Sequence, residues 1–524
     1  MFLVNLIVFI LVLGIIILIH ELGHFFFAKR ANILCHEFAI GMGPAIWQKR
    51  KGETIYSIRS IPIGGYVSMA GEAVSDALIK REQVIGVKLN QQGQVIHINL
   101  VDTVESDLMG IVRDYDLYGK DFDPLFIDLD VNGKIEHLSV LRDATYKLSQ
   151  TKEMWITPSE KSFESKTLWQ RFLVIFAGPF MNFVLAFVLF LIVGFFVLKP
   201  NLDSSEVSFV GENTPAETMG LEVGDVITEI NGETITSWND LSLVMKQNQT
   251  VHLSISYRRD GQTFNDPLVT VGVLIQTAGL SNVSADGTIY STETIIGRAT
   301  GRASSGDGLE AGDLVTHIEQ DGVKVPVNHW DDIIAYFKTH TSGTVTVTYV
   351  DQEDQTLKTF TYDLISENAL SKLGYQSIMF QIGISPTSSF DLGYTLLYPF
   401  RSIGSNVMQV LNTLGLLFDR SENLGLSDLS GPVGIFSLVS QTTSQGILSI
   451  IGFTAFLSIN IGLLNLLPIP ALDGGRLVFL GIEAVTRKPL NRKLENTINN
   501  VMFFLLIGLF IFVTYNDILR LIMG

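Results

Sequence analysis

The stretch FLVNLIVFILVLGIIILIHELGHFFFAKR, residues 2–30, decides the fold of this chain. Residues 2–19 are apolar apart from Asn5 and Gly14. As a helix these residues rise about 27 Å, close to the thickness of the hydrocarbon core of a bilayer. A signal peptide is the alternative, but the basic N-terminal region and small-residue cleavage site that it requires are missing from this stretch. We therefore predict a permanent transmembrane helix over residues 1–28.

The predicted helix continues directly into His20-Glu21-Leu22-Gly23-His24, an HExxH pattern. Residues four apart lie on one helical face, so both imidazoles can bind one Zn²⁺, and Glu21 can take a proton from a water beside the metal. Ionisable side chains at the end of a membrane span are costly and usually functional. The alternative is a His/Glu cluster that faces lipid headgroups. The pattern favours His20 and His24 as metal ligands and Glu21 as the catalytic base.

The composition supports several membrane spans joined to polar domains. The chain has 524 residues, a hydrophobic fraction of 47% and a mean hydropathy of +0.33. Cys35 is the single cysteine, which excludes an intramolecular disulfide. The net charge of −17 argues against general nucleic-acid binding.

Three further apolar segments predict transmembrane helices over 169–198, 447–475 and 498–522. The loop at 29–68 holds six basic and two acidic residues, whereas 199–385 holds 25 acidic and 10 basic residues. By the positive-inside rule the loops after the first and third spans are cytoplasmic. Both termini and residues 199–385 are then predicted to lie outside the cytoplasm.

The segment 388–446 is also apolar in part, but Tyr394, Tyr398, Pro399 and Arg401 interrupt it. We interpret it as helices that lie on the outer membrane surface. A fifth span is the alternative.

Two cytoplasmic segments separate the first two spans. Residues 29–72 are predicted as a membrane-associated β-hairpin region, in which Ile55–Met69 forms two strands that turn at Gly64–Gly65. Residues 73–168 are polar with short strand-like pieces, which predicts a β-rich insertion.

An internal repeat predicts two similar domains at 200–280 and 290–385. Gly220–Asp225 reads GLEVGD and Gly308–Asp313 reads GLEAGD. Each hexapeptide is followed by a strand, a polar turn and a Trp-Asx-Asp helix start. The copies resemble PDZ domains, which are small α/β folds. Two unrelated β-domains with chance hexapeptides are the alternative.

A catalytic zinc requires a third protein ligand. The other seven of the nine histidines fall in polar domains or surface loops, which leaves Asp473 as the candidate. This residue closes the third predicted span on the cytoplasmic side, as His20 and His24 close the first. A carboxylate at that depth is costly unless a cation compensates it. By itself an Asp-Gly-Gly helix-ending turn is the simpler interpretation, but the pairing with HExxH favours a metal ligand.

These motifs together resemble the bacterial site-2 protease family of intramembrane zinc metalloproteases. The resemblance covers nearly the whole chain and rests on four stretches: HExxH, Gly64-Gly65-Tyr66-Val67, Gly178-Pro179-Phe-Met-Asn182-Phe183, and Asn465 through Pro468 to Asp473-Gly474. It implies that His20, His24 and Asp473 bind Zn²⁺ and that Glu21 is the catalytic base. It also implies that Asn465 helps to hold the substrate backbone. Residues 61–69, with Gly64 and Gly65, would pair with an extended substrate strand.

The resemblance further implies the substrates and the location. The implied partners are single-span membrane proteins, such as anti-sigma factors or remnant signal peptides, together with membrane lipid and no nucleic acid. The implied location is the inner or plasma membrane of a bacterial cell. The predicted fold is therefore a multi-span α-helical membrane protein with four transmembrane helices, two extracytoplasmic PDZ-like α/β domains and a cytoplasmic β-rich insertion.

Two other classes of protein remain to be distinguished from this one. A membrane-bound PDZ receptor or scaffold would need no HExxH and would contain no zinc. A transporter with a metal site would need more spans or an inverted repeat.

Overall fold

The structure, a computed structural model, describes residues 1–71, 78–101, 104–149, 153–419, 422, 425, 429–488 and 491–523. The start of the predicted insertion (73–77) and part of the predicted surface-helix segment (420–421, 423–424 and 426–428) lie outside the described residues. The chain forms two compact units, residues 1–190 with 436–509 and residues 191–435 with 510–524.

Four helices in the described part of the chain are long and apolar enough to cross a membrane: Phe2–Arg30, Leu168–Gly194, Ile447–Leu466 and Lys493–Leu519. Each of them overlaps one of the four predicted spans, 1–28, 169–198, 447–475 and 498–522. They belong to α1 (Phe2–Arg30), α2 (Leu168–Gly194), α9 (Ile447–Leu466) and α11 (Arg492–Met523). The segment predicted to lie on the membrane surface contains α7 (Leu392–Leu417) and α8 (Pro432–Ser444), neither of which is among the four.

The third predicted span, 447–475, is two helices rather than one. Helix α9 ends at Leu466, and a separate helix, α10 (Asp473–Thr486), begins at Asp473. Pro468 and Pro470 lie between them, and proline cannot supply the backbone N–H that a continuing helix needs. The prediction that Asp473 closes the third helix is therefore wrong, because this residue opens the next one.

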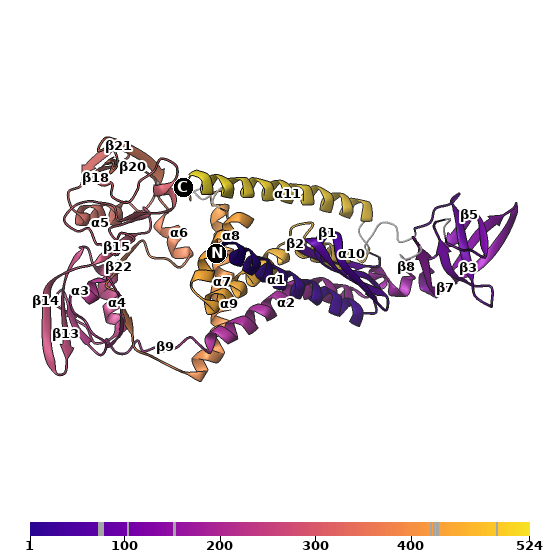
Figure 1. The fold of residues 1–524 in the computed structure, drawn as a ribbon, viewed down its shortest axis with the longest axis horizontal. Helices are drawn as coiled ribbons and strands as arrows, with labels where there is room; N and C mark the ends of the chain where they lie inside the picture. Colours follow the sequence, from indigo (N-terminus) through magenta and orange to yellow (C-terminus); the bar gives the residue numbers. More distant parts are fainter. Residues whose placement is uncertain are drawn as a thin grey trace. The chain divides into compact units, whose positions relative to one another are not determined.

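Helices α1 and α2 run side by side in the first unit (Figure 1) and approach very closely. A Cβ added at Gly23 would lie 2.4 Å from the carbonyl oxygen of Ala177. Helix α9 packs against α2, since the Ser458 hydroxyl of α9 donates to the carbonyl oxygen of Asn182 of α2 at 2.8 Å. Small residues permit this close backbone contact, which drives helix association in membranes.

Strands β1 (Cys35–Lys51) and β2 (Thr54–Met69) form a sheet after α1. Both strands bend, so residues 37–40 of β1 pair with 55–58 of β2 on one side and with 65–68 on the other. The reversal between β1 and β2 lies at Gly52–Glu53. Strand β2 then changes direction, since residues 55–58 run parallel to 37–40 of β1 and residues 65–68 run antiparallel to them. The predicted reversal near Gly64–Gly65 is therefore confirmed, but the two arms of β2 pair with β1 and not with each other. Gly64, with a φ of 80°, lies at the bend that carries β2 from one side of β1 to the other.

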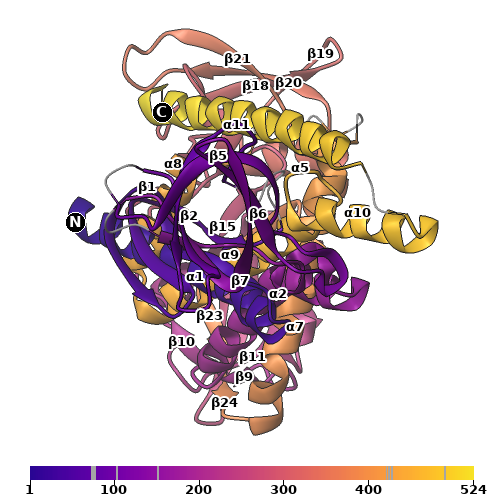
Figure 2. The same cartoon turned by 90° about the vertical axis from the view of Figure 1, so that its right-hand side faces the viewer.

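The predicted β-rich insertion is a curved antiparallel sheet closed by one parallel pair (Figure 2). Its strands are β3 (Val84–Leu89), β4 (Val95–Asn99), β5 (Leu108–Asp116), β6 (Phe126–Val131), β7 (Lys134–Lys147) and β8 (Glu153–Trp155). They follow the order β4-β3-β5-β6-β7-β8, and β4 also pairs with β7. The closure buries an apolar interior that includes Val87, Ile127 and Leu129.

The second unit confirms the predicted repeat. One copy holds β11 (Val226–Ile230), β12 (Glu233–Thr234), α4 (Trp238–Gln247), β13 (His252–Arg259) and β14 (Gln262–Thr270). The other holds β18 (Leu314–Gln320), β19 (Val323–Pro326), α5 (Trp330–Thr339), β20 (Thr344–Val350) and β21 (Leu357–Asp363). The strand orders correspond, β12-β11-β13-β14 and β19-β18-β20-β21.

The GLExGD hexapeptide has the same role in each copy. The buried carboxylates of Asp225 and Asp313 each accept the backbone N–H three residues earlier, at 2.8 Å. This local bond fixes the turn that leads into the core strand.

The structure corrects the boundary between the two repeated domains. Strand β22 (Ile378–Gln381) pairs with β15 (Gly272–Ile275), and β23 (Ile384–Pro386) pairs with β10 (Val207–Val210). Ile382, between them, is buried in the core of the first domain. Ile378 of β22 is buried in the core of the second domain. Residues 382–386, predicted as the end of the second domain, instead complete the first, because strands can pair across any distance in sequence.

Two substitutions that both fall within the predicted range 290–385 should therefore destabilise different domains. Ile382 is 5% exposed in the first core and Leu364 is 3% exposed in the second. Ile382→Ala should destabilise the first domain, and Leu364→Ala the second, each by about 2–5 kcal/mol. Hydrogen exchange of β11 and β13 against β18 and β20 measures this. Loss of protection in the same domain for both variants would contradict the nested arrangement.

Candidate metal centre

The HExxH residues lie in the last third of α1. His20 and His24 are 8% and 7% exposed, and their Nε2 atoms lie 3.2 Å apart. The spacing of four residues places both rings on the same face of the helix. Two imidazoles thus converge on one buried point.

Asp473 completes the convergence. Its Oδ2 lies 3.2 Å from His20 Nε2 and 3.4 Å from His24 Nε2. These three residues form a group that can hold a metal ion. Ligand atoms bound to zinc at about 2.0–2.1 Å in a tetrahedron lie roughly 3.3 Å from one another. The observed triangle therefore matches three corners of a tetrahedral zinc site, whose fourth corner would be open to a water or a substrate.

The two glycines after Asp473 allow α10 to pack closely on the chain that precedes it. A Cβ at Gly474 would lie 2.1 Å from the carbonyl oxygen of Leu467, and one at Gly475 would lie 2.4 Å from that of Ile469. Only glycine permits the first turn of α10 to pack so closely on the chain that leaves α9. The Asp-Gly-Gly sequence is thus explained by close packing as well as by chemistry.

Helix α2 supports His24 from behind. The His24 Nδ1–H donates to the carbonyl oxygen of Val174 at 2.8 Å. With the proton on Nδ1, the Nε2 lone pair faces the Asp473 carboxylate, as a metal ligand requires. One turn further along α2, a Cβ at Gly178 would lie 2.2 Å from His24 Nε2. Gly178 therefore leaves the space that the imidazole fills.

Glu21 faces the bent sheet. A Cβ at Gly65 would lie 3.0 Å from Glu21 Cγ and 2.9 Å from the carbonyl oxygen of Ala39. Residues 65–69 form an outer strand, and within the described part of the chain β1 is the only strand that pairs with it. The HExxH glutamate and the outer strand are thus neighbours.

A carboxylate on β1 holds the sheet in shape. Glu37 accepts hydrogen bonds from Ser57 Oγ at 2.5 Å, Arg59 Nη2 at 2.6 Å and Tyr66 OH at 2.8 Å. Burial by itself would raise the pKa of the Glu37 carboxyl, but the three donors outweigh it and lower the pKa. Burial and the bond to Glu37 raise the pKa of Tyr66 to about 12. Glu37 of β1 is therefore hydrogen-bonded to both arms of β2, through Ser57 and Arg59 before Gly64 and through Tyr66 after it.

The other predicted site residues lie at the end of α9 and in β2. Asn465 is half-buried in the last turn of α9, just before the break that leads to Asp473. Gly64 and Gly65 lie at the bend of β2. Sequence reasoning assigned no role to Glu37, Val174 or Gly178. The Gly178-Pro179 pair inside an apolar helix was a signal for Gly178, whereas a backbone carbonyl such as that of Val174 leaves none.

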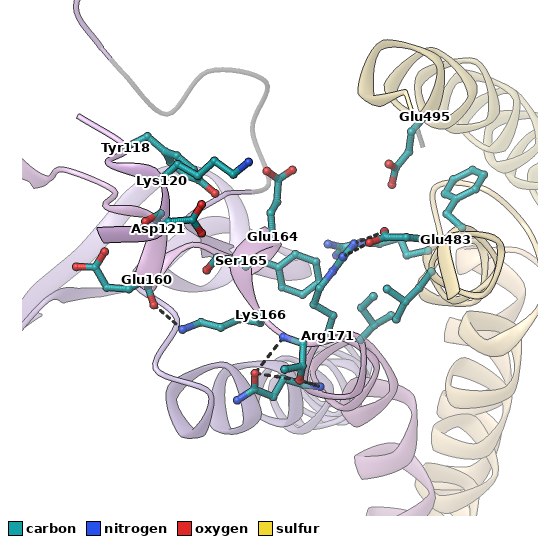
Figure 3. A pocket seen from close by; sticks show the side chains of 18 of the residues that line it. Tyr118, Lys120, Asp121, Glu160, Glu164, Ser165, Lys166, Arg171, Glu483 and Glu495 are labelled. Carbon is teal, nitrogen blue, oxygen red and sulfur yellow. Dashed lines mark hydrogen bonds and ion pairs between the residues drawn. The ribbon is translucent and has the colours of Figure 1, made fainter. Parts of the chain in front are cut away.

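A cavity of about 820 Å³ is lined in part by residues of α2 and α10 (Figure 3), and none of the predicted site residues lines it. Along its wall Arg171 of α2 and Glu483 of α10 form two bonds, of 2.8 and 2.9 Å. The guanidinium groups of Arg171 and Arg476 both lie over the Phe163 ring. These contacts brace α10, and through it Asp473, against α2.

Helices apolar enough to span a membrane, combined with an HExxH pair and a carboxylate from a second helix, are typical of a membrane metallopeptidase. Residues 8–509 match Peptidase family M50, and the chain belongs to this family. It is a metalloprotease.

Similar proteins cover the full length of the chain. Zinc metalloprotease RasP of Shouchella clausii is 31% identical over 523 residues, with 99% of each chain covered. Regulator of sigma-W protease RasP of Bacillus subtilis is 30% identical over 524 residues, with 99% of this chain and 100% of the relative covered. The PDZ domain of an SdrC-like protein from Listeria monocytogenes matches 14% of this chain and 76% of its own, at 24% identity and a TM-score of 0.12. That score is too low to support a statement about fold.

The packing at His24 predicts the effect of a single methyl group. Gly178→Ala should displace the His24 ring and reduce both bound metal and proteolysis severely, because the added Cβ overlaps the imidazole. Gly452→Ala on α9 is the matched control, since a Cβ there meets no atom within 4 Å among the described residues. Metal analysis of the purified proteins and cleavage of a reporter measure the difference. Normal metal content in Gly178→Ala would contradict the observed packing.

Proposed function

We propose that this chain is an intramembrane zinc protease that cleaves the transmembrane segments of single-span membrane proteins. The triangle of His20, His24 and Asp473 carries the proposal, because its edges of 3.2–3.4 Å suit three ligands of one zinc ion. The zinc metalloprotease names of the full-length relatives support the choice of metal.

Zinc bound by these three residues would supply a Lewis acid that acidifies a water and polarises a substrate carbonyl. Glu21 takes a proton from the attacking water, whose oxygen bonds to the carbonyl carbon of the scissile peptide. Glu21 then delivers a proton to the leaving nitrogen as the C–N bond breaks. The products are a new carboxyl group and a new amine.

The outer strand 65–69 explains how a membrane-embedded peptide reaches this chemistry. A helical substrate hides its peptide groups in internal hydrogen bonds, so it must unwind before cleavage. Among the described residues, β1 alone pairs with 65–69, so the other edge of this strand can offer backbone partners to the unwound segment, beside Glu21. Gly64 and Gly65 would allow close approach of that segment, and Asn465 in the last turn of α9 would hold its backbone.

The substrate class follows from the relatives. The Bacillus subtilis relative carries the name regulator of sigma-W protease. We therefore propose anti-sigma factors, and remnant signal peptides, as substrates of this chain in regulated intramembrane proteolysis.

The proposed location is a bacterial inner or plasma membrane. The exposed apolar side chains of α7, among them Leu392, Leu396 and Phe400, would contact lipid at the outer surface. In the proposed orientation the metal centre and the insertion face the cytoplasm, and the two PDZ-like domains lie outside.

The assignment of the base predicts a separation of metal binding from turnover. Glu21→Gln should retain zinc and lose turnover by at least about 10²-fold, because the amide cannot transfer the proton. His24→Ala and Asp473→Ala should lose zinc and turnover together. The measurement is cleavage of a tagged single-span reporter in detergent, with zinc content determined on the same samples. Cleavage by Glu21→Gln at the wild-type rate would falsify the role of Glu21.

The proposed orientation predicts which side of the membrane each domain faces. In a Cys35→Ala background, Gln262→Cys should react with an impermeant thiol reagent on intact cells, after permeabilisation of an outer membrane if there is one. Lys134→Cys, on the insertion, should react only after lysis. Both sites are exposed, so access to the reagent alone decides the result. The reverse pattern would place the PDZ-like domains in the cytoplasm.

A further inference from the structure

The stretch Gly178-Pro179-Phe-Met-Asn182 of α2 contains a residue that the proposed mechanism does not use. Asn182 is fully buried, at 0% exposure, beside the first HExxH histidine. Its Nδ2 lies 3.3 Å from His20 Nδ1. Its Oδ1 is buried without a hydrogen-bond partner among the described residues. A buried amide placed in this way needs an explanation.

The two histidines pose the same chemical requirement. An imidazole that binds a metal through Nε2 carries its proton on Nδ1, and that N–H needs an acceptor. For His24 the acceptor is the backbone carbonyl of Val174. The side-chain amide of Asn182 lies beside His20 Nδ1, as the Val174 carbonyl lies beside His24 Nδ1. Because α1 and α2 run antiparallel, the earlier histidine meets the later residue of α2.

A side-chain amide can supply this acceptor, because its oxygen and its NH2 group are nearly alike in size and can exchange places. Rotation of the Asn182 amide by 180° presents Oδ1, instead of Nδ2, to His20 Nδ1. Oδ1 then accepts the Nδ1–H, which leaves the Nε2 lone pair directed at the carboxylate of Asp473. The same rotation gives the buried oxygen the donor that it lacks.

We propose that Asn182 is a positioning residue of the metal centre, whose side-chain oxygen accepts the Nδ1–H of His20 and fixes that ring as a ligand. The proposal rests on the proposed binding of zinc by His20. In this proposal α2 supports both histidines. The backbone carbonyl of Val174 accepts from His24, and the side-chain oxygen of Asn182 accepts from His20.

Packing and ligand orientation use different atoms of Asn182. The backbone carbonyl of this residue accepts the hydroxyl of Ser458 from α9 at 2.8 Å. The side chain is directed at His20. A change at Ser458 therefore disturbs the packing of α9 on α2 at the same point, but leaves the contact with the imidazole in place.

The test is zinc affinity, measured by competition with a chelator on the purified full-length protein. Asn182→Leu keeps a similar volume and removes the acceptor, so it should weaken zinc binding by about 10–100-fold. Asn182→Asp keeps an acceptor oxygen and should bind zinc within a few-fold of the wild-type affinity. Ser458→Ala is the matched control, and should lower the unfolding temperature without a change in zinc affinity.

Two outcomes would overturn the proposal. Wild-type zinc affinity in Asn182→Leu would show that the amide has no such role, and equal weakening in Ser458→Ala would assign the effect to packing. If Asn182→Leu does not fold, the comparison of Asn182→Ala with Asn182→Asp decides, since only the latter restores an acceptor. His20→Ala serves as a reference: unchanged zinc affinity in that variant would instead overturn the proposed ligand set.

Discussion

The arrangement of the first unit depends on three side chains that meet in an apolar helix bundle. Two imidazoles from α1 and one carboxylate from α10 place their ligand atoms 3.2–3.4 Å apart. A carboxylate in such surroundings is stable only beside groups that compensate its charge. The close contacts at Gly23, Gly178 and Gly474 are best understood from this requirement, because each removes a side chain that would hold the helices apart.

Hydrogen bonds outside the metal centre hold the elements that surround it. Glu37 ties both arms of β2 to β1, which holds the outer strand beside Glu21. The paired bonds between Arg171 and Glu483 hold α10 on α2. Bidentate pairs of this kind fix direction as well as distance. A hydrolytic site needs such support, since a small displacement of a catalytic group lowers the rate steeply.

Much of this protein could be predicted from its sequence, because the relevant signals are local. A helix places residues four apart on one face, so the HExxH pair was visible without a structure. The apolar segments marked all four candidate spans of the described chain, and the GLExGD copies marked the repeat. The errors concern which segments are neighbours and where an element begins. The two arms of β2 on either side of Gly64 pair with β1 and not with each other, and Asp473 begins α10 instead of ending α9.

The sequence by itself determined the class of chemistry, because residue type and helical spacing define which groups can share a metal. Only the tertiary structure decided how those groups meet. It placed Asp473 against two histidines some 450 residues earlier in the chain, and it set a backbone carbonyl behind His24 and an amide behind His20. It also returned Ile382 and β23 to the first PDZ-like domain. Contacts between distant segments depend on packing and backbone hydrogen bonds, which leave no fixed spacing in the sequence.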